Sequence, residues 1–270
     1  MNTPARGSHV PRRRFGQHFL HDEAVLAQIV AAVAARAGDR LVEIGPGEGA
    51  LTGPLLATGI ALTVIELDRD LAARLRARAH PRLEVVEADV LDVDLAALAS
   101  RLGGPLRLVG NLPYNISTPI LFQALAAAEH LVDMHFMLQK EVVVRMAAEP
   151  GSRDYGRLSV MLQARCQVQP LFDVAPHAFR PPPKVDSAVV RLLPTAPQRA
   201  AVNDPARFAA IVKAAFAQRR KTLRNSLRSL VDSDALARVG IDPGQRAEQV
   251  PVDAWIALAN AATNISPGAG

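Results

Sequence analysis

The chain contains little cysteine, few aromatic residues and no long hydrophobic run. Its 270 residues include one cysteine, one tryptophan and two tyrosines. Because one cysteine cannot form an internal disulfide, a disulfide-stabilised scaffold is excluded and a cytoplasmic location is expected. No apolar run reaches the ~18 residues of a membrane span, and no apolar stretch follows the basic N-terminus as in a signal peptide. The seven histidines show no metal-ligand spacing, so no metal site is expected.

What the chain does contain is abundant apolar residues and an uneven distribution of charge. The apolar share is 49%, which excludes intrinsic disorder and is enough for a hydrophobic core. The net charge is +5; residues 1–15 carry four arginines and no acid, and ten Lys and Arg face six Asp and Glu from residue 196 onward. Two basic ends around a near-neutral middle predict a catalytic domain flanked by surfaces for a polyanion, with solubility alone as the alternative.

Apolar segments typical of strands alternate with helical segments over the first half of the chain. The predicted strands are 41–45, 62–67, 83–88, 106–110 and 131–138, and the predicted helices lie near 22–37, 50–57, 69–79, 93–101 and 118–128. This alternation predicts an α/β, Rossmann-like fold in which helices cover both faces of a mostly parallel sheet. Two more strands are expected at 166–174 and 185–192, followed by helix from 205 onward. We place the boundary near 195, between a catalytic domain (1–195, with a basic segment at 1–21) and a small all-helical domain (196–270).

Polar groups follow three of the predicted strands. The first strand leads into EIGPGEGA at 43–50, where Gly45 and Gly47 allow a tight turn and close approach of a ligand. Glu66 ends the second strand, where a carboxylate can accept both ribose hydroxyls, and Asp89 follows the third, where it can accept from an adenine amino group. The pattern predicts a nucleotide cofactor. Its spacing also fits G-x-G-x-x-A, so a nicotinamide dinucleotide stays an alternative, disfavoured because no second nucleotide-binding half is visible.

The fourth strand ends in Asn111-Leu112-Pro113-Tyr114, the Asn/Asp-x-Pro-aromatic pattern of amino-methyltransferases that act on nucleic-acid bases. Across nearly its whole length the chain resembles the small-subunit ribosomal RNA adenine dimethyltransferases, the kasugamycin-sensitivity family. The segments that carry this resemblance are RRRFGQHFL (12–20), EIGPGEGALT (43–52), GNLPYNISTPIL (110–121), QKEVVVRM (139–146), DYGRLSV (154–160), FRPPPKVDSAVVRL (179–192) and AFAQRRKTLRNSL (215–227).

The resemblance implies an enzyme that uses S-adenosyl-L-methionine as methyl donor. Two neighbouring adenosines in the 3′-terminal hairpin loop of 16S rRNA would become N6,N6-dimethyladenosine, within the biogenesis of the small ribosomal subunit. The family usually has Asn where this chain has His18. The cofactor-binding residues that the resemblance implies are His18, Leu20, Glu43, Gly45, Gly47, Glu66, Asp89 and Asn111.

The residue types of the Asn111 tetrad suit transfer to an adenine amine. The N6 lone pair is delocalised into the ring, and two hydrogen-bond acceptors on its N–H groups would localise it. The Asn111 side-chain oxygen and the Leu112 carbonyl are the predicted acceptors, and Pro113 completes the tetrad. Tyr114 is expected to stack on the extruded base, with Phe179 as candidate for its opposite face.

A basic stretch near the C-terminus is the predicted RNA-binding surface. Residues 213–228 contain no acid, and on a continuous helix positions 220, 224 and 228 would share one face. The predicted RNA-binding residues are Arg12, Arg13, Arg14, Arg219, Arg220, Lys221, Arg224 and Arg228. A solvated helix face, a large-subunit rRNA dimethyltransferase and a non-catalytic RNA-binding assembly factor remain as alternatives. We expect a monomer that binds 16S rRNA in the small subunit.

Overall fold

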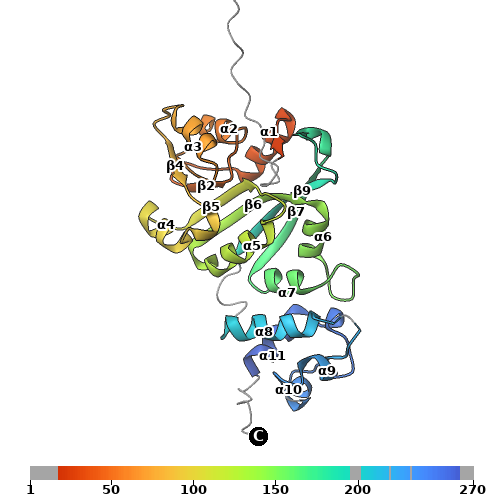
Figure 1. Cartoon of the computed structure of the whole chain (residues 1–270). Coiled ribbons are helices and arrows are strands. Elements are labelled where there is room, and N and C mark those ends of the chain that lie inside the picture. The colour runs from red at the N-terminus through yellow and green to blue at the C-terminus, as the bar shows by residue number, and fades with distance from the viewer. Residues whose placement is uncertain (1–17, 195–201, 219, 232, 262–270) are drawn as a thin grey trace, which may run out of the picture. The chain divides into compact units, whose positions relative to one another are not determined.

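The computed structural model describes residues 18–194, 202–218, 220–231 and 233–261, and its elements are labelled in Figure 1. The strands are β1 (Phe19–Leu20), β2 (Arg40–Ile44), β3 (Leu62–Glu66), β4 (Leu83–Glu87), β5 (Leu106–Asn111), β6 (Leu131–Gln139), β7 (Cys166–Val174), β8 (Phe179–Arg180) and β9 (Ser187–Pro194). The α-helices are α1 (Glu23–Val33), α2 (Thr52–Ala57), α3 (Arg69–Arg76), α4 (Leu95–Leu102), α5 (Ser117–Ala126), α6 (Lys140–Ala147), α7 (Arg157–Gln163), α8 (Pro205–Phe216), α9 (Leu223–Leu227), α10 (Ser233–Arg238) and α11 (Val252–Ala261). Short 3-10 turns are η2 (Val90–Asp92), η3 (Ala128–His130), η4 (Pro176–Ala178) and η5 (Ala247–Gln249).

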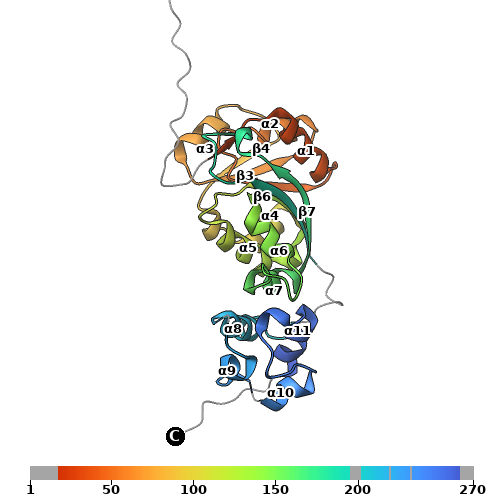
Figure 2. The ribbon, with the colours of Figure 1, turned by 90° about the vertical axis from the view of Figure 1, so that its right-hand side faces the viewer.

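The main sheet has seven strands in the order β4-β3-β2-β5-β6-β9-β7. β2 pairs in parallel with both β3 and β5, and β3 pairs in parallel with β4. Figures 1 and 2 show α1, α2 and α3 on one side of β2, β3 and β4, and α4 and α5 on the other. Because both faces are covered, β2 and β3 are buried along nearly their whole length, which agrees with the high apolar share of both strands.

A second, two-stranded pairing lies outside this sheet. β1 runs antiparallel to β8, with Phe19 opposite Arg180 and Leu20 opposite Phe179. The pairing joins the beginning of the described chain to the proline-rich segment 179–184. No sequence pattern predicted these two-residue strands.

Aspartates stand at the N-caps of four of the described α-helices, α1, α3, α4 and α8. Asp22, Asp68 and Asp94 stand at the N-caps of α1, α3 and α4, and each side chain accepts hydrogen bonds from two main-chain N–H groups of the following turn. Such caps satisfy donors that have no partner inside the helix. The helix predicted over 22–37 ends earlier, at Val33, because the next residue, Ala34, adopts a left-handed conformation (φ 46°).

The described residues form two compact units. The first combines the described part of Met1–His130 with His135–Gln139 and Asp173–Val189, and the second combines the remaining described residues. The core of the second unit includes Trp255, which is fully buried. Within this unit α7 packs on α8 and α11, so the compact unit is larger than the segment 196–270. The functional division near residue 195 stays a prediction.

The basic stretch is not one continuous helix, which corrects the prediction for this region. α8 ends at Phe216 and α9 begins at Leu223, whose N–H donates to the carbonyl of Gln245. Leu223 and Leu227 are fully buried, so core packing and this main-chain bond give α9 a start of its own. Arg220 precedes α9 and Arg228 follows it, so 220, 224 and 228 do not share a helix face.

The close spacing of β2 and β5 generates a test of the packing. A Cβ added to Gly110 on β5 would lie 2.5 Å from the carbonyl oxygen of Ile44 on β2, whereas one added to Gly53 in α2 would meet no atom within 4 Å. Gly110→Ala should lower the free energy of unfolding by about 1–3 kcal/mol, the typical effect of overpacking. Gly53→Ala, the control, should leave it unchanged or raise it by up to ~1 kcal/mol. Urea denaturation measures both, and equal midpoints for the two variants would contradict this close approach of the two strands.

Candidate active site

The first unit contains a cavity of about 320 Å³ at the carboxyl ends of β2, β3, β4 and β5. Its volume lies in the range of small-molecule and cofactor sites. Parallel pairing explains its position, because the residues that follow these strands meet at one edge of the sheet. The predicted site residues that line it are His18, Leu20, Glu43, Gly45, Gly47, Glu66, Asp89, Asn111, Leu112, Pro113 and Tyr114.

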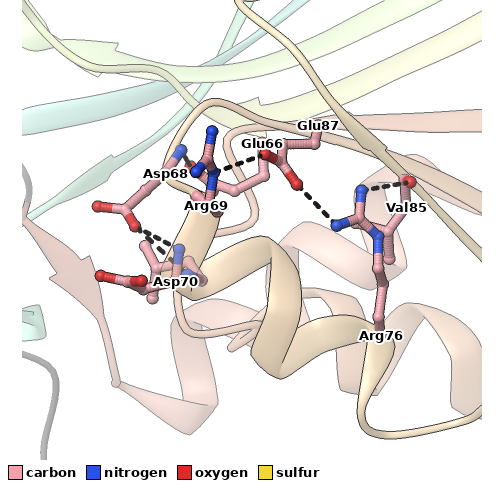
Figure 3. Close-up of polar contacts among 8 residues, drawn as sticks. Glu66, Asp68, Arg69, Asp70, Arg76, Val85 and Glu87 are labelled. Atoms are coloured by element: carbon pink, nitrogen blue, oxygen red, sulfur yellow. Dashed lines mark hydrogen bonds and ion pairs between the residues drawn. The ribbon is translucent and has the colours of Figure 1, made fainter.

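Glu66 connects the end of β3 to the glycine loop. One carboxylate oxygen accepts from the Gly47 N–H (3.0 Å) and the other from the Asp68 N–H (2.8 Å, Figure 3). Burial raises the pKa of this carboxyl, while the main-chain hydrogen bonds act in the opposite direction. Gly47 itself has a φ of 57°, and a Cβ there would approach the Phe19 ring to 2.9 Å. The loop therefore needs glycine at this position both for its conformation and for its packing.

Two acids, one at the end of β4 and one two residues beyond it, have different environments. Glu87, at the end of β4, forms ion pairs with Arg76 (2.7 Å) and Arg69 (3.3 Å) of α3, as Figure 3 shows. The hydrogen bond from Arg76 is the main cause that lowers the pKa of Glu87. Asp89 lines the cavity instead, and one of its carboxylate oxygens accepts from the Leu91 N–H at 2.9 Å. Of these two acids, Asp89 is therefore the one that a ligand in the cavity can reach.

Glu43 is a buried acid in the wall of the same cavity. Its carboxylate is 2% exposed and accepts a hydrogen bond from the Thr52 hydroxyl at 2.6 Å. Burial, reinforced by the nearby Glu66 charge, raises the pKa of Glu43 to about 7, although the Thr52 bond and the Arg78 charge lower it. Glu43 therefore changes charge close to neutral pH.

Asn111 ends β5, and its amide is held in a defined orientation. Its Nδ2 donates to the main-chain carbonyl of His18 at 2.9 Å. The side-chain oxygen is the acceptor atom of this amide, so it is the atom that can accept a hydrogen bond from a ligand. The next residue, Leu112, donates its N–H to the carbonyl of Met137 on β6 at 3.1 Å, which anchors the tetrad to the sheet.

Tyr114 is held at the cavity wall from two sides. Its hydroxyl shares a hydrogen bond of 2.6 Å with the Ser187 hydroxyl, and burial raises its pKa. The His18 ring lies beside it, with ring centroids 5.6 Å apart and an interplanar angle of 30°. The Nδ1 of His18 bonds to the Pro181 carbonyl at 2.7 Å. These contacts leave the tyrosine ring little rotational freedom.

Known proteins resemble this chain in sequence and in fold. The family described as ribosomal RNA adenine dimethylase matches residues 8–264. The chain belongs to this family. Ribosomal RNA small subunit methyltransferase A of Xanthomonas axonopodis pv. citri (strain 306) is 59% identical over 251 residues, 92% of this chain and 95% of that protein. The predicted family is confirmed, and so are the enzyme class and S-adenosyl-L-methionine as cofactor of this dimethylase.

Two solved structures resemble the dimethylase along most of its length. A dimethyladenosine transferase from Plasmodium falciparum has a TM-score of 0.75 at 24% identity, covering 89% of this chain and 96% of that one. The 23S rRNA methyltransferase ErmE has a TM-score of 0.68 at 28% identity, covering 90% of this chain and 99% of that one. The predicted Rossmann-like fold with a C-terminal helical part is confirmed. No helix among the described residues is long and apolar enough to cross a membrane.

The residues in the cavity fit this cofactor. A methionine portion, a ribose and an adenine need a close main-chain approach and hydrogen-bond acceptors. The glycine loop, the Glu66 carboxylate and the Asp89 carboxylate provide these along consecutive strand ends. The two buried acids, Glu43 and Glu66, also suit a ligand that carries positive charge. Which atom of the cofactor each residue contacts stays a prediction.

Phe179 is the predicted catalytic residue that the structure does not bring to the cavity. Its side chain is 1% exposed and does not line the cavity, so the stacking role predicted for it has no support in this geometry. Sequence patterns also missed Ser187 and His135, a buried residue in the cavity wall. Side chains alternate between the two faces of a strand, so His135 and Met137 of β6 share one face. This alternation is the sequence signal that could have identified His135.

The predicted RNA-binding residues lie outside the cavity lining. Arg220, Lys221, Arg224 and Arg228 are exposed residues of the second unit. Arg12, Arg13, Arg14 and Arg219 fall outside the residues that the structure describes. Four of the eight predicted RNA-binding residues are therefore exposed in the structure.

Glu43 generates a prediction about pH. Its pKa rises from 4.5 to about 7 on folding, so its contribution to stability is complete below pH 4.5 and is lost as pH rises through 7. Glu43→Gln cannot ionise but still accepts from Thr52. Relative to wild type, this variant should therefore gain stability from pH 5 to pH 8. Urea denaturation across that range tests this, and a constant difference between the two proteins would contradict the raised pKa.

Proposed function

We propose that this dimethylase converts two adjacent adenosines in the 3′-terminal hairpin loop of 16S rRNA to N6,N6-dimethyladenosine. It would act as a monomer in the cytoplasm, within small-subunit biogenesis. The observation that supports this reaction is the position of the Asn111 amide, which lines the cavity and donates from its nitrogen to the His18 carbonyl. The choice of RNA rests on relatives named for the small subunit at 59% identity, against 28% for the 23S rRNA methyltransferase.

The chain's own residues prepare the adenine amine as a nucleophile. When bound, S-adenosyl-L-methionine supplies a methyl group on a positively charged sulfur. In the first transfer, the Asn111 side-chain oxygen accepts from one N–H of the adenine, and the Leu112 carbonyl accepts from the other. These two bonds localise the nitrogen lone pair, and neither acceptor removes a proton before the attack. The methylated nitrogen then loses one proton to solvent, so the second transfer begins from an amine with a single N–H, which one of the two acceptors engages. Alignment of the two reactants provides much of the rate.

Tyr114 stacks on the extruded adenine. Stacking of a base on an aromatic ring contributes ~1–3 kcal/mol, which offsets part of the cost of unstacking the base from its neighbours. The Ser187 and His18 contacts described above hold the ring in place before RNA arrives. Glu66 binds the ribose hydroxyls and Asp89 the adenine amino group of the cofactor.

Substitutions of Asn111 and Glu66 should affect methyl transfer and cofactor binding differently. Asn111→Ala should abolish most transfer and leave cofactor affinity within a few-fold. Glu66→Ala should weaken cofactor binding roughly tenfold to a hundredfold, because it removes a charge-assisted hydrogen bond worth ~1.5–3 kcal/mol. Calorimetry with the cofactor and turnover with unmethylated small subunits measure the two effects. Glu87→Ala, outside the cavity lining on the next strand, is the control.

Two results would contradict this assignment. Equal losses of cofactor affinity and turnover in Asn111→Ala would remove the adenine-accepting role of Asn111. Unchanged cofactor affinity in Glu66→Ala would remove the ribose role of Glu66. Mapping the transferred label onto the RNA tests the substrate itself, because label in large-subunit rRNA alone would favour the alternative class.

The basic stretch of the second unit supports the RNA docking that we propose. Arg220, Lys221, Arg224 and Arg228 form no ion pair with any residue that the structure describes, and residues 213–228 contain no acid. Solvated helix faces usually mix acids with bases, whereas phosphate contacts need unpaired cations. Arg12, Arg13, Arg14 and Arg219 belong to the same proposal, although they lie outside the described residues.

Replacing Arg220, Arg224 and Arg228 with Gln should weaken binding to small subunits and reduce its salt dependence. Each lost phosphate contact should reduce the log–log salt slope by about 0.7–0.9, hence up to about 2–3 in total. Cofactor affinity should not change, because the cavity lies in the first unit. Filter binding at several salt concentrations measures this, with the charge-preserving Lys triple variant as control. A slope equal to that of wild type would show that these arginines do not contact phosphate.

A further inference from the structure

A proline-rich loop, residues 180–186, leads from β8 to β9 and is attached at both ends to residues that line the cavity. At its start, Arg180 pairs with Phe19, and the Pro181 carbonyl accepts from the His18 ring at 2.7 Å. At its end, the adjoining Ser187 bonds to the Tyr114 hydroxyl at 2.6 Å. Phe19, His18 and Tyr114 all belong to the cavity wall. The loop therefore adjoins the cavity wall, although its own residues are not part of the lining, and we call it the rim.

Two exposed cations stand on this loop. Arg180 and Lys184 are exposed, and neither forms an ion pair with a described residue. The only acid within 180–186 is Asp186, which is also exposed and has no such partner. Pro181, Pro182 and Pro183 fix the φ angle of the main chain at three consecutive positions between the two cations. A segment that is already restricted loses little conformational entropy when it binds a ligand.

The position of these cations matches the chemistry of the substrate. An adenosine whose base lies against Asn111 and Tyr114 must leave its stack, and it carries a phosphate on each side of its ribose. Those phosphates cannot enter the cavity with the base, so they come to its rim. Arginine offers a planar fork of donors and lysine a compact charge, and both bind phosphate.

We infer that Arg180 and Lys184 bind the RNA phosphates that flank the target adenosine and so position the base for transfer. This rests on the proposed rRNA substrate and deepens it. The two cations form a phosphate-binding rim in the first unit, separate from the basic stretch of the second. The rim contacts the sugar–phosphate chain at the reacting nucleotide, and it carries no base specificity of its own.

The test compares Arg180→Gln/Lys184→Gln with a control of equal charge loss, Arg74→Gln/Arg82→Gln. Arg74 lies in α3 and Arg82 immediately precedes β4, and neither residue lines the cavity. Binding of unmethylated small subunits is measured by filter binding at several salt concentrations. Initial rates give KM and kcat for the subunits, and calorimetry gives cofactor affinity.

The rim variant should lower the magnitude of the salt slope by about 1.4–1.8, that is 0.7–0.9 for each of two contacts, and the control should match wild type. Its KM for subunits should rise, with kcat at saturation within about twofold. Cofactor affinity should stay unchanged. Arg180→Lys/Lys184→Arg, which preserves both charges, should retain most of the wild-type slope.

An unchanged slope in the rim variant overturns the inference, and so does an equal reduction in the control, because the effect would then come from net charge alone. The proposed function fails in a different way. A wild-type protein that binds small subunits without methylating their RNA contradicts the function, while the comparison of slopes still decides whether the rim contacts phosphate.

Discussion

The parallel pairing of β4, β3, β2 and β5 determines where the polar groups at the ends of these strands lie. Parallel strands end at the same edge of the sheet, so the glycine loop, Glu66, Asp89 and Asn111 meet although they are far apart in the sequence. The Glu66 carboxylate then links two of these strand ends, because it accepts from Gly47 after β2 and from Asp68 after β3. Without this shared edge, neither the cavity nor the orientation of its acids would exist.

The charge of the site depends on which of its neighbouring acids form ion pairs with arginines. Glu87 is neutralised by two arginines of α3 and lies outside the cavity lining. Glu43 and Glu66 lie within the lining, and burial raises the pKa of each. Two acids whose ionisation is opposed by burial form a site that gains most from a positively charged ligand. A sulfonium cofactor is such a ligand, so its charge and that of the cavity are complementary.

The sequence predicted the features that depend on local patterns. Runs rich in apolar residues located the strands β2 to β7 within a few residues, and glycines and strand-end acids located the edge of the sheet where the cavity lies. It could not predict bonds between distant segments, such as the Asn111 amide with the His18 carbonyl or Tyr114 with Ser187. Phe179 illustrates the same limit, because an aromatic residue beside prolines gives no sign of whether it is buried. The break between α8 and α9 also depends on a distant partner, the Gln245 carbonyl.

Different groups are proposed for methyl transfer and for RNA affinity, and they differ in charge. The groups that we propose to surround the target base, the Asn111 amide, the Leu112 carbonyl and the Tyr114 ring, carry no charge, and bonds to the rest of the first unit hold Asn111 and Tyr114. Interactions of this kind respond weakly to salt, because they involve no exchange of counterions. The cations assigned to the RNA are exposed and unpaired with other described residues, and contacts of that kind weaken steeply as salt increases. Ionic strength should therefore govern how often the enzyme engages its RNA, while in the proposed mechanism the rate of methyl transfer within the complex depends on the orientation of Asn111 and Tyr114.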